Sequence, residues 1–239
     1  MYSVVVIVGN ELQSTLLRLM DAVTGERHEV VVRRLVIAGF TGRDSSGVEA
    51  HVEELRLLGV PAPDSTPAFY EVDPRLLTTN GQIEVGGALT SGEIEPVVIQ
   101  NDGDLLLCVG SDHTDREVEK TSIEASKSAC AKVVSSTCVR VDEIADWDSI
   151  RIRSTLDEES SFYQDDSLAQ LLPLPEILAR ATKSVGRLDS GAVVFLGTVP
   201  VLDGHVRASA RFEGELCIAG IADPLRISYQ IARSQMKGE

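Results

Sequence analysis

From residue 81 onward, the chain is a succession of short apolar runs, each broken by glycine, asparagine or aspartate. Runs of this length between such residues are typical of β-strands joined by turns. The runs do not alternate regularly with helical segments, which argues against a doubly wound parallel sheet. We therefore expect a mostly β protein of the α+β class, with two or three helices.

Two segments have the spacing and the boundary residues of helices. Residues 45–58, SSGVEAHVEELRLL, begin with serines that can cap a helix, and Gly59 and Pro61 end the apolar stripe. In residues 167–182, SLAQLLPLPEILARAT, Pro173 and Pro175 are expected to open a helix in the second half. Residues 11–22, ELQSTLLRLMDA, also have helical spacing but lie among strand-like runs, so their state stays open.

The size and charge of the chain limit the classes of function that it can have. With 239 residues, of which 43% are hydrophobic, it can form one large domain, or a domain with a small appendage. Its formal net charge of −15 opposes binding to nucleic acid and to anionic membranes. No window approaches the roughly 20 apolar residues of a membrane span, and the first residues do not resemble a signal peptide. We expect a cytoplasmic protein.

The cysteines and histidines show no metal-binding pattern along the sequence. The four cysteines contain no C-x-x-C, and the four histidines no H-x-x-x-H. This scatter argues against a zinc site and for a reduced protein in which cysteines are small core residues. Signatures of serine hydrolases, P-loops and dinucleotide-binding loops are also missing.

One hairpin brings three carboxylates together. Residues 91–117, SGEIEPVVIQNDGDLLLCVGSDHTDRE, contain two apolar runs around Asp102-Gly103, a strong two-residue turn signal. With that turn, Glu93 lies opposite Asp112, whereas a three-residue turn would shift the pairing by one. Glu95 projects on the same face as Glu93, because side chains two apart in a strand point the same way.

Three adjacent carboxylates repel one another and raise one another's pKa unless something neutralises them. A divalent cation is the simplest such group, and an all-oxygen ligand set favours Mg²⁺, Mn²⁺ or Ca²⁺ over zinc. Three protein ligands would leave about three octahedral positions for water or substrate. The alternative is a solvated end of a sheet, since E-x-E is common by chance.

The segments around this hairpin resemble the fumarylacetoacetate hydrolase superfamily. The similarity covers about residues 36–204, and no single motif is specific, whereas their order and spacing are. The segments are 39–72, GFTGRDSSGVEAHVEELRLLGVPAPDSTPAFYEV, with its H-x-x-E; 93–95, E-x-E, with 112–117, DHTDRE; 126–159, beginning SKSACAKVV; 162–182, beginning FYQDD; and 188–200, LDSGAVVFLGTVP. Ser111 before the aspartate, Pro96 after E-x-E and the longer GTVP loop mark a divergent branch without an assigned substrate.

The resemblance implies a fold and an organisation. We expect a mixed β-sandwich or β-roll of the fumarylacetoacetate hydrolase type, with a small N-terminal β segment over residues 1–35 and a catalytic domain over residues 36–239. It also implies a homodimer, for which the sequence itself shows no interface.

The resemblance also implies catalytic roles. Glu93, Glu95 and Asp112 would hold Mg²⁺ or Mn²⁺, with Ca²⁺ possible in a crystal. His51 and Glu54 would be a dyad on a helix able to close as a lid, in which glutamate orients the histidine and the histidine takes a proton from water. Without the resemblance, this pair reads as an exposed helix pair.

Further residues would bind the substrate or stabilise charge. The ammonium of Lys127 would stabilise an enolate oxygen, with Lys132 as the next candidate for that role. Arg116 could bind a substrate carboxylate, or pair with Glu93 or Glu117. Thr198 and Gln164 would contact the substrate. His113 could support a ligand carboxylate, although a loop histidine without a ligand role is the preferred interpretation.

These parts predict a metal-dependent hydrolase that cleaves a C–C bond in a 2-oxo or 1,3-dicarbonyl carboxylic acid through an enolate. Decarboxylation, isomerisation or hydration of an oxo acid at the same site is the alternative within enzymes. A non-catalytic metal- or ligand-binding protein with the same fold is the alternative outside them.

Overall fold

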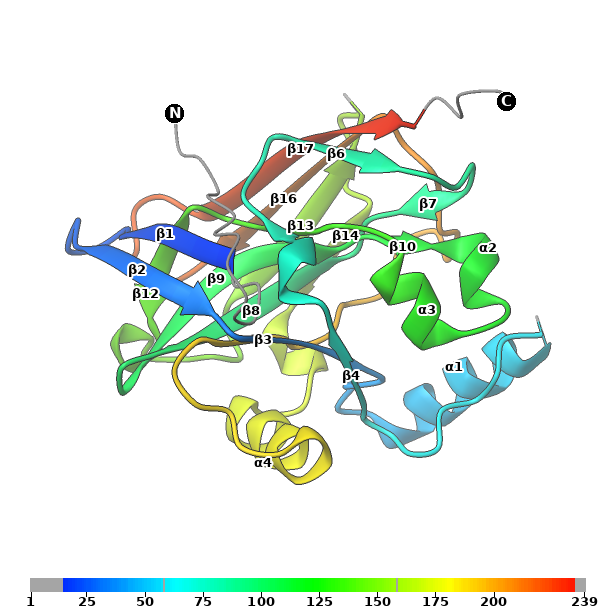
Figure 1. Ribbon diagram of the computed structural model, residues 1–239, viewed down its shortest axis with the longest axis horizontal. Helices are drawn as coiled ribbons and strands as arrows, with labels where there is room; N and C mark the ends of the chain where they lie inside the picture. The colour runs from blue at the N-terminus through cyan, green and yellow to red at the C-terminus, as the bar shows by residue number, and fades with distance from the viewer. Residues whose placement is uncertain (1–14, 58, 158, 235–239) are drawn as a thin grey trace, which may run out of the picture.

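The computed structural model describes residues 15–57, 59–157 and 159–234, and it forms two packed β-sheets with helices at their margins (Figure 1). The larger sheet has ten strands, in the order β2-β1-β12-β9-β8-β15-β3-β4 with β11 and β5 beside this path. Its strands are β1 (Thr15–Asp21), β2 (Arg27–Val32), β3 (Arg34–Gly39), β4 (Ala68–Val72), β5 (Leu77–Thr78), β8 (Ile94–Asn101), β9 (Asp104–Asp112), β11 (Lys132–Val134), β12 (Thr137–Arg140) and β15 (Ala192–Phe195). The predicted mostly β architecture with a few short helices is confirmed.

The second sheet has five strands in the order β14-β13-β16-β17-β6, and a short ribbon joins β10 to β7. These strands are β6 (Gln82–Val85), β7 (Thr90–Ser91), β10 (Thr114–Asp115), β13 (Arg151–Leu156), β14 (Gln164–Ser167), β16 (Arg211–Cys217) and β17 (Leu225–Arg233). The helices are α1 (Ser45–Leu57), α2 (Arg116–Glu119), α3 (Ile123–Ser128) and α4 (Leu174–Val185), with 3₁₀ turns η1 (Pro74–Leu76), η2 (Val141–Glu143) and η3 (Leu168–Gln170).

The central hairpin β8–β9 has the register that a two-residue turn predicts. Asp102 and Gly103 both have positive φ, 46° and 99°, which is the backbone of a tight hairpin turn. Asn101 pairs with Asp104, and the amide of Asp112 donates to the carbonyl of Glu93 at 3.0 Å. The acidic ends of the two strands are therefore adjacent, as the turn chemistry requires.

The ten-stranded sheet buries side chains on both faces. Along β8, Ile94 and Val98 pack in the core shared with the second sheet, while Val97 and Ile99 pack in a second cluster with β1 and β2. This alternation follows from the two-residue repeat of a strand. It explains why the strands of the hairpin read as continuous apolar runs.

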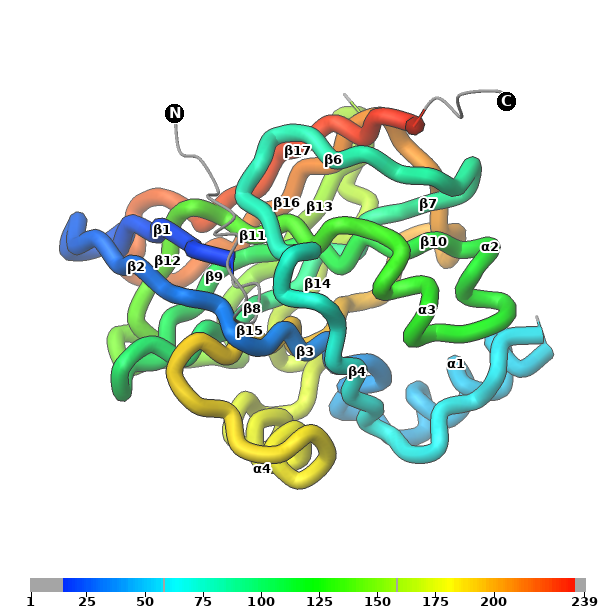
Figure 2. Tube along the Cα trace, in the orientation of Figure 1, coloured from blue at the N-terminus to red at the C-terminus, as the bar shows by residue number. Residues whose placement is uncertain are grey.

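The segment whose state the sequence left open is a strand from residue 15. In β1 every second residue is buried, and the strand pairs with β2 on one side and, in parallel, with β12 on the other. The tube trace shows this β1–β2 hairpin beside β12 and β9 (Figure 2). Residues 1–14 lie outside the described residues, and the division at residue 35 stays a prediction.

Both predicted helices are present, with different environments. Helix α4 begins directly after Pro173 and buries Leu174, Ile177 and Ala181. Helix α1 fully buries none of its described residues, and Val48, Val52 and Leu55 of the expected apolar stripe are only half-buried. Among the described residues, no helix combines the length and the apolar composition needed to cross a membrane.

Gly110 lies at the most crowded point of β9, so Gly110→Ala should destabilise the protein. A Cβ there would lie 2.6 Å from Val97 Cγ2, 2.7 Å from Phe195 Cε1 and 2.9 Å from the carbonyl oxygen of Val133. Overpacking of this kind costs about 1–3 kcal/mol in the free energy of unfolding, measurable by urea denaturation. The control Gly86→Ala meets no atom within 4 Å. An equal loss in both variants would contradict this packing.

Candidate active site

The three carboxylates lie where β8 begins and β9 ends. Glu95 and Asp112 are buried, with 2% and 0% of their surface exposed, and the side chain of Glu93 is 20% exposed. Carboxylates this deep need counter-charges or hydrogen bonds. The structure supplies a different partner for each.

Asp112 is held between two buried ammonium groups. Lys127 forms an ion pair with Oδ2, and Lys132 Nζ lies 2.7 Å from Oδ1 while donating to the carbonyl of His113 at 2.6 Å. Burial alone would raise the pKa of Asp112, but the two lysines outweigh it and hold the pKa below its ordinary range. Burial lowers the pKa of Lys127, but the charges of Asp112 and Glu95 raise it by more, so the pKa lies above its ordinary value.

Glu95 forms no comparable ion pair with any described residue. Its Oε2 accepts a hydrogen bond from the amide of Gly197 at 2.8 Å. Burial, and then the charge of Asp112, raise the pKa of Glu95 well above its ordinary value, against the opposing effect of Lys127. Gly197 has φ of 96°, and a Cβ there would collide with Thr41. Only glycine therefore brings this amide to the carboxylate without strain.

Glu93 pairs with Arg116. The distance from Nη2 to Oε2 is 2.9 Å, and the same guanidinium donates to Ser91 at 2.7 Å and to Glu119 at 3.0 Å. Burial lowers the pKa of Arg116, but the two glutamates raise it above its ordinary value. The sequence suggested Glu93 or Glu117 as the partner of Arg116. The structure pairs Arg116 with Glu93 and with Glu119, and not with Glu117. Binding of a substrate carboxylate by Arg116 stays a prediction.

Repulsion among the three carboxylates does not by itself require a metal, because three cationic side chains neutralise the cluster. Among the described residues, one cluster of three potential metal ligands has its ligand atoms within 4.8 Å of one another. That cluster does not contain Glu93, Glu95 or Asp112. Their donor type still fits a hard cation, since all the donors are oxygens.

Gln164 and Thr198 link the loop after β15 to the start of β8. Gln164 donates to Thr198 Oγ1 at 2.8 Å and accepts from the amide of Ile94 at 3.1 Å. Thr198 in turn donates to the carbonyl of Ile94 at 2.7 Å. Ile94 lies between the two glutamates, so these contacts position the carboxylates. A direct contact of either side chain with substrate stays a prediction.

His51 and Glu54 lie on the exposed helix α1. Nδ1 and Oε2 are 3.5 Å apart, and the side chains are 57% and 68% exposed. The ring of His51 also approaches Phe40, with 6.1 Å between centroids. Figure 1 shows α1 at the margin of the molecule, outside the two sheets. The spacing of a dyad is present, and its catalytic role stays a prediction.

His113 belongs to a neutral buried network. Its two ring nitrogens lie 3.0 Å from Tyr229 Oη and 3.0 Å from Thr90 Oγ1. Burial, followed by the nearby Lys132 and Arg116, lowers the pKa of His113 to about 3. The imidazole is therefore neutral at physiological pH and supports the fold beside the carboxylates.

Solved structures share this fold at low sequence identity. A fumarylpyruvate hydrolase from Pseudomonas aeruginosa, in complex with Mn²⁺ and pyruvate, has a TM-score of 0.63 and 16% identity over 95% of this chain and 99% of that one. A provisionally assigned fumarylpyruvate hydrolase from Burkholderia cenocepacia has a TM-score of 0.65 and 16% identity, over 98% and 97%. A 2-keto-3-deoxy-D-arabinonate dehydratase has 0.61 and 14%, over 98% and 96%. The fumarylacetoacetate hydrolase fold inferred from the sequence is confirmed.

No curated protein sequence matches the chain. The model of a family described as proteins of unknown function, DUF2848, matches residues 38–229. This range contains the β8–β9 hairpin, both lysines of the cluster, helix α1 and the loop after β15. The chain therefore belongs to the DUF2848 family, a divergent group with the fold of the fumarylacetoacetate hydrolases.

Proposed function

We propose that the protein is a divalent-metal-dependent enzyme that hydrolyses a C–C bond in a 2-oxo or 1,3-dicarbonyl carboxylic acid. The observation that supports it most is the buried combination of Asp112, Glu95 and Lys127. Buried carboxylates and a buried ammonium with displaced pKa values are costly to maintain and are typical of functional sites. A structural relative with the same fold was solved with Mn²⁺ and pyruvate, an oxo acid.

Glu93, Glu95 and Asp112 would hold Mg²⁺ or Mn²⁺ in this proposal. When bound, such a cation supplies Lewis-acid charge that polarises the adjacent oxygens of an oxo acid. Glu93 would then exchange its ion pair with Arg116 for the cation. The guanidinium released in this way would become available for a substrate carboxylate, which it can bind through two hydrogen bonds.

His51 would transfer the proton, and Lys127 would stabilise the negative charge that develops on the substrate. His51, oriented by Glu54, takes a proton from water, and the water oxygen bonds to the distal carbonyl carbon of the substrate. The C–C bond next to that carbon breaks, and its electron pair forms an enolate whose oxygen faces the ammonium of Lys127. The proton held by His51 then returns to the enolate carbon. The products are a carboxylic acid and a shorter oxo acid.

A second candidate is a decarboxylase, isomerase or hydratase of an oxo acid at the same carboxylates. The exposure of His51 on α1 favours decarboxylation or isomerisation in particular, because these two reactions consume no water and need no base to activate one. One of the structural relatives is a dehydratase. A protein that binds a metal or ligand without catalysis is the third candidate. A homodimer and a cytoplasmic location are further proposals, testable by sedimentation and by fractionation.

Titration of Mg²⁺ and Mn²⁺ by calorimetry tests the metal site, with wild type and Glu95→Gln as the central pair. We expect binding to wild type and at least about 100-fold weaker binding to the variant, because a ligand is lost. Glutamine can still accept the hydrogen bond from Gly197, so the fold should be retained. Glu119→Gln is the matched control, since Glu119 contacts Arg116 but is not one of the three carboxylates.

The titration is repeated with oxalate, a stable analogue of the oxo-acid end of the substrate. Binding that requires oxalate and disappears in Glu95→Gln would support the same site. Equal affinity in wild type and Glu95→Gln, or no binding even with oxalate, would contradict the proposal. A positive result is followed by a screen of 2-oxo and 1,3-dicarbonyl acids for consumption of substrate.

A further inference from the structure

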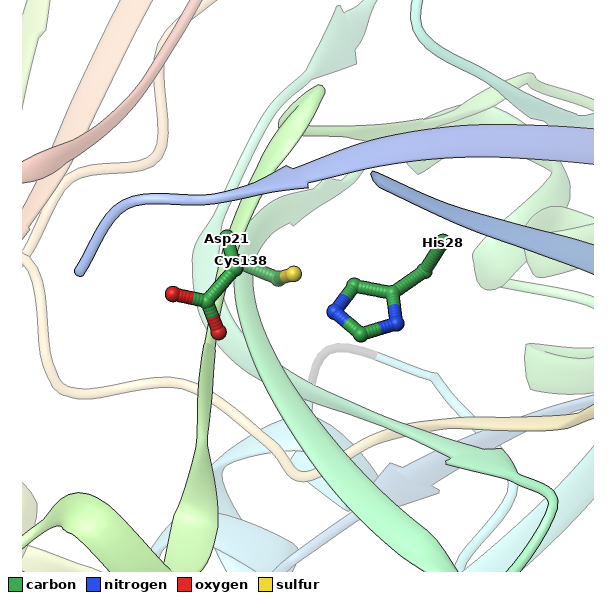
Figure 3. Close-up of side chains that lie close together, drawn as sticks. All are labelled: Asp21, His28 and Cys138. Carbon is green, nitrogen blue, oxygen red and sulfur yellow. The ribbon is translucent and has the colours of Figure 1, made fainter. Parts of the chain in front are cut away.

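A second cluster of potential metal ligands lies away from the carboxylates, on the β1–β2 hairpin and β12. Asp21, His28 and Cys138 are 1%, 6% and 0% exposed, and one potential ligand atom from each lies within 4.8 Å of the others. The three side chains come from three strands and lie close together (Figure 3). Asp21 and Cys138 are paired residues of the parallel strands β1 and β12.

The strand pattern makes these polar residues unusual. The buried side of β1 runs from Leu17 and Leu19 to Asp21, and the buried side of β2 from Val30 to His28. Both rows belong to the same apolar cluster, and both change to a ligand-type residue at the same end. Aliphatic residues at these positions would extend the core at no polar cost. The aspartate and histidine therefore need a partner.

Two buried atoms at this point have no hydrogen-bond partner among the described residues. They are Asp21 Oδ2 and His28 Nε2. Asp21 Oδ1, in contrast, accepts from the amides of Val23 and Thr24 at 2.8 Å each, which fixes the carboxylate. Figure 3 shows the thiol of Cys138 directed toward the imidazole ring. Buried polar atoms without partners are rare in proteins and point to an ion or water that completes them.

We propose that Asp21, His28 and Cys138 form a zinc site that fastens the β1–β2 hairpin to β12. One nitrogen, one sulfur and one oxygen donor suit Zn²⁺ and not Mg²⁺. Zn²⁺ bonds of about 2.0–2.3 Å require only a small closure of the cluster and leave a fourth tetrahedral position for water. On binding, the S–H bond of Cys138 breaks, its proton leaves to solvent, and a sulfur–zinc bond forms.

A zinc site at this point differs from the sequence-based expectation, which the scattered cysteines and histidines gave, that the protein has none. Positions 21, 28 and 138 have no recognisable spacing, because the third ligand comes from a strand that pairs with β1 only after the chain has folded. The site is separate in chemistry from the all-oxygen carboxylates. It would hold even if the proposed enzymatic function were wrong.

Cobalt substitution tests the site directly. Protein purified without a polyhistidine tag is treated with a chelator and titrated with Co²⁺ in the presence of excess Mg²⁺, which occupies sites made only of oxygen. We expect one equivalent of Co²⁺ to bind with a thiolate-to-cobalt charge-transfer absorption, and Zn²⁺ to displace it. The absorption identifies a cysteine ligand, which no carboxylate site can imitate.

Three variants assign the absorption to this cluster. Cys138→Ser and His28→Gln should lose the absorption. Cys217 is a half-buried cysteine on β16, so Cys217→Ser should keep the absorption. Glu95→Gln should also keep it, because the carboxylate site is elsewhere. If Cys138→Ser fails to fold, the wild-type protein provides the test. Zn²⁺ should then slow the alkylation of Cys138 relative to that of Cys217, as measured by mass spectrometry of the peptides.

The proposal is overturned by either of two results. The first is Co²⁺ titration of wild type without the charge-transfer absorption and without protection of Cys138 by Zn²⁺. The second is an absorption of equal strength in folded Cys138→Ser.

Discussion

Asp112→Asn is expected to lower the free energy of unfolding of the metal-free protein by about 3–5 kcal/mol, because it leaves two buried ammonium groups without their counter-charge. Lys127 and Lys132 both pair with this carboxylate, and both are buried. An exposed ion pair would lose far less, since water replaces the missing partner. Urea denaturation followed by circular dichroism, with a chelator present, measures the change.

Two further variants make this result specific. Glu176→Gln removes the partner of Arg180 in a pair whose side chains are 39% and 48% exposed, and should cost about 0.5 kcal/mol or less. The double variant Asp112→Asn/Lys132→Met should lose less than Asp112→Asn alone, because one uncompensated charge is gone. A loss for Asp112→Asn no larger than that for Glu176→Gln would show that the lysines are not held as charged groups.

The sequence predicted the parts of the site that depend on local geometry. The Asp102-Gly103 turn sets the register of β8 and β9, so the adjacency of Glu93 and Asp112 follows from a few neighbouring residues. Pro173 likewise marks the start of α4. In each case the signal and the structure it predicts lie within one turn or one hairpin, where steric preferences of single residues decide the outcome.

The partners of the carboxylates could not be predicted in the same way. Lys132 lies opposite Asp112 because β11 pairs with β9, and the amide of Gly197 reaches Glu95 from a loop more than 100 residues away along the chain. The negative charges lie within one hairpin and follow from its sequence, whereas the pairing of Lys127 and Lys132 with Asp112 depends on segments outside that hairpin. Pairing between distant strands has no local signature.

Helix α1 shows a different limit. Its apolar spacing at Val48, Val52 and Leu55 predicted a face against the core, yet these side chains are only half-buried and no described residue of the helix is fully buried. Periodicity shows which face of a helix is apolar, but it does not show what covers that face. His51 and Glu54 lie on the exposed side of this half-buried helix, and the expected closure of the helix as a lid stays a prediction.

His51→Ala therefore separates the candidate reactions, with an expected fall in kcat/KM for C–C bond hydrolysis of about 10²- to 10⁴-fold. The loss comes from removing the base that takes a proton from water. Decarboxylation of a 2-oxo diacid by the same protein needs no such base and should be retained. Product analysis by nuclear magnetic resonance distinguishes the two reactions in one sample.

The exposure of His51 makes this test clean, because truncation of a side chain that is 57% exposed should leave the stability of the fold unchanged. Glu53→Gln is the matched control on the same helix, since Glu53 pairs with Arg56 and has no proposed role. Hydrolysis at the wild-type rate in His51→Ala would exclude the histidine as the base. If that variant bound Mn²⁺ and consumed an oxo acid without hydrolysing its C–C bond, the carboxylates and Lys127 would be sufficient for the chemistry, and the reaction would belong to the decarboxylases, isomerases or hydratases.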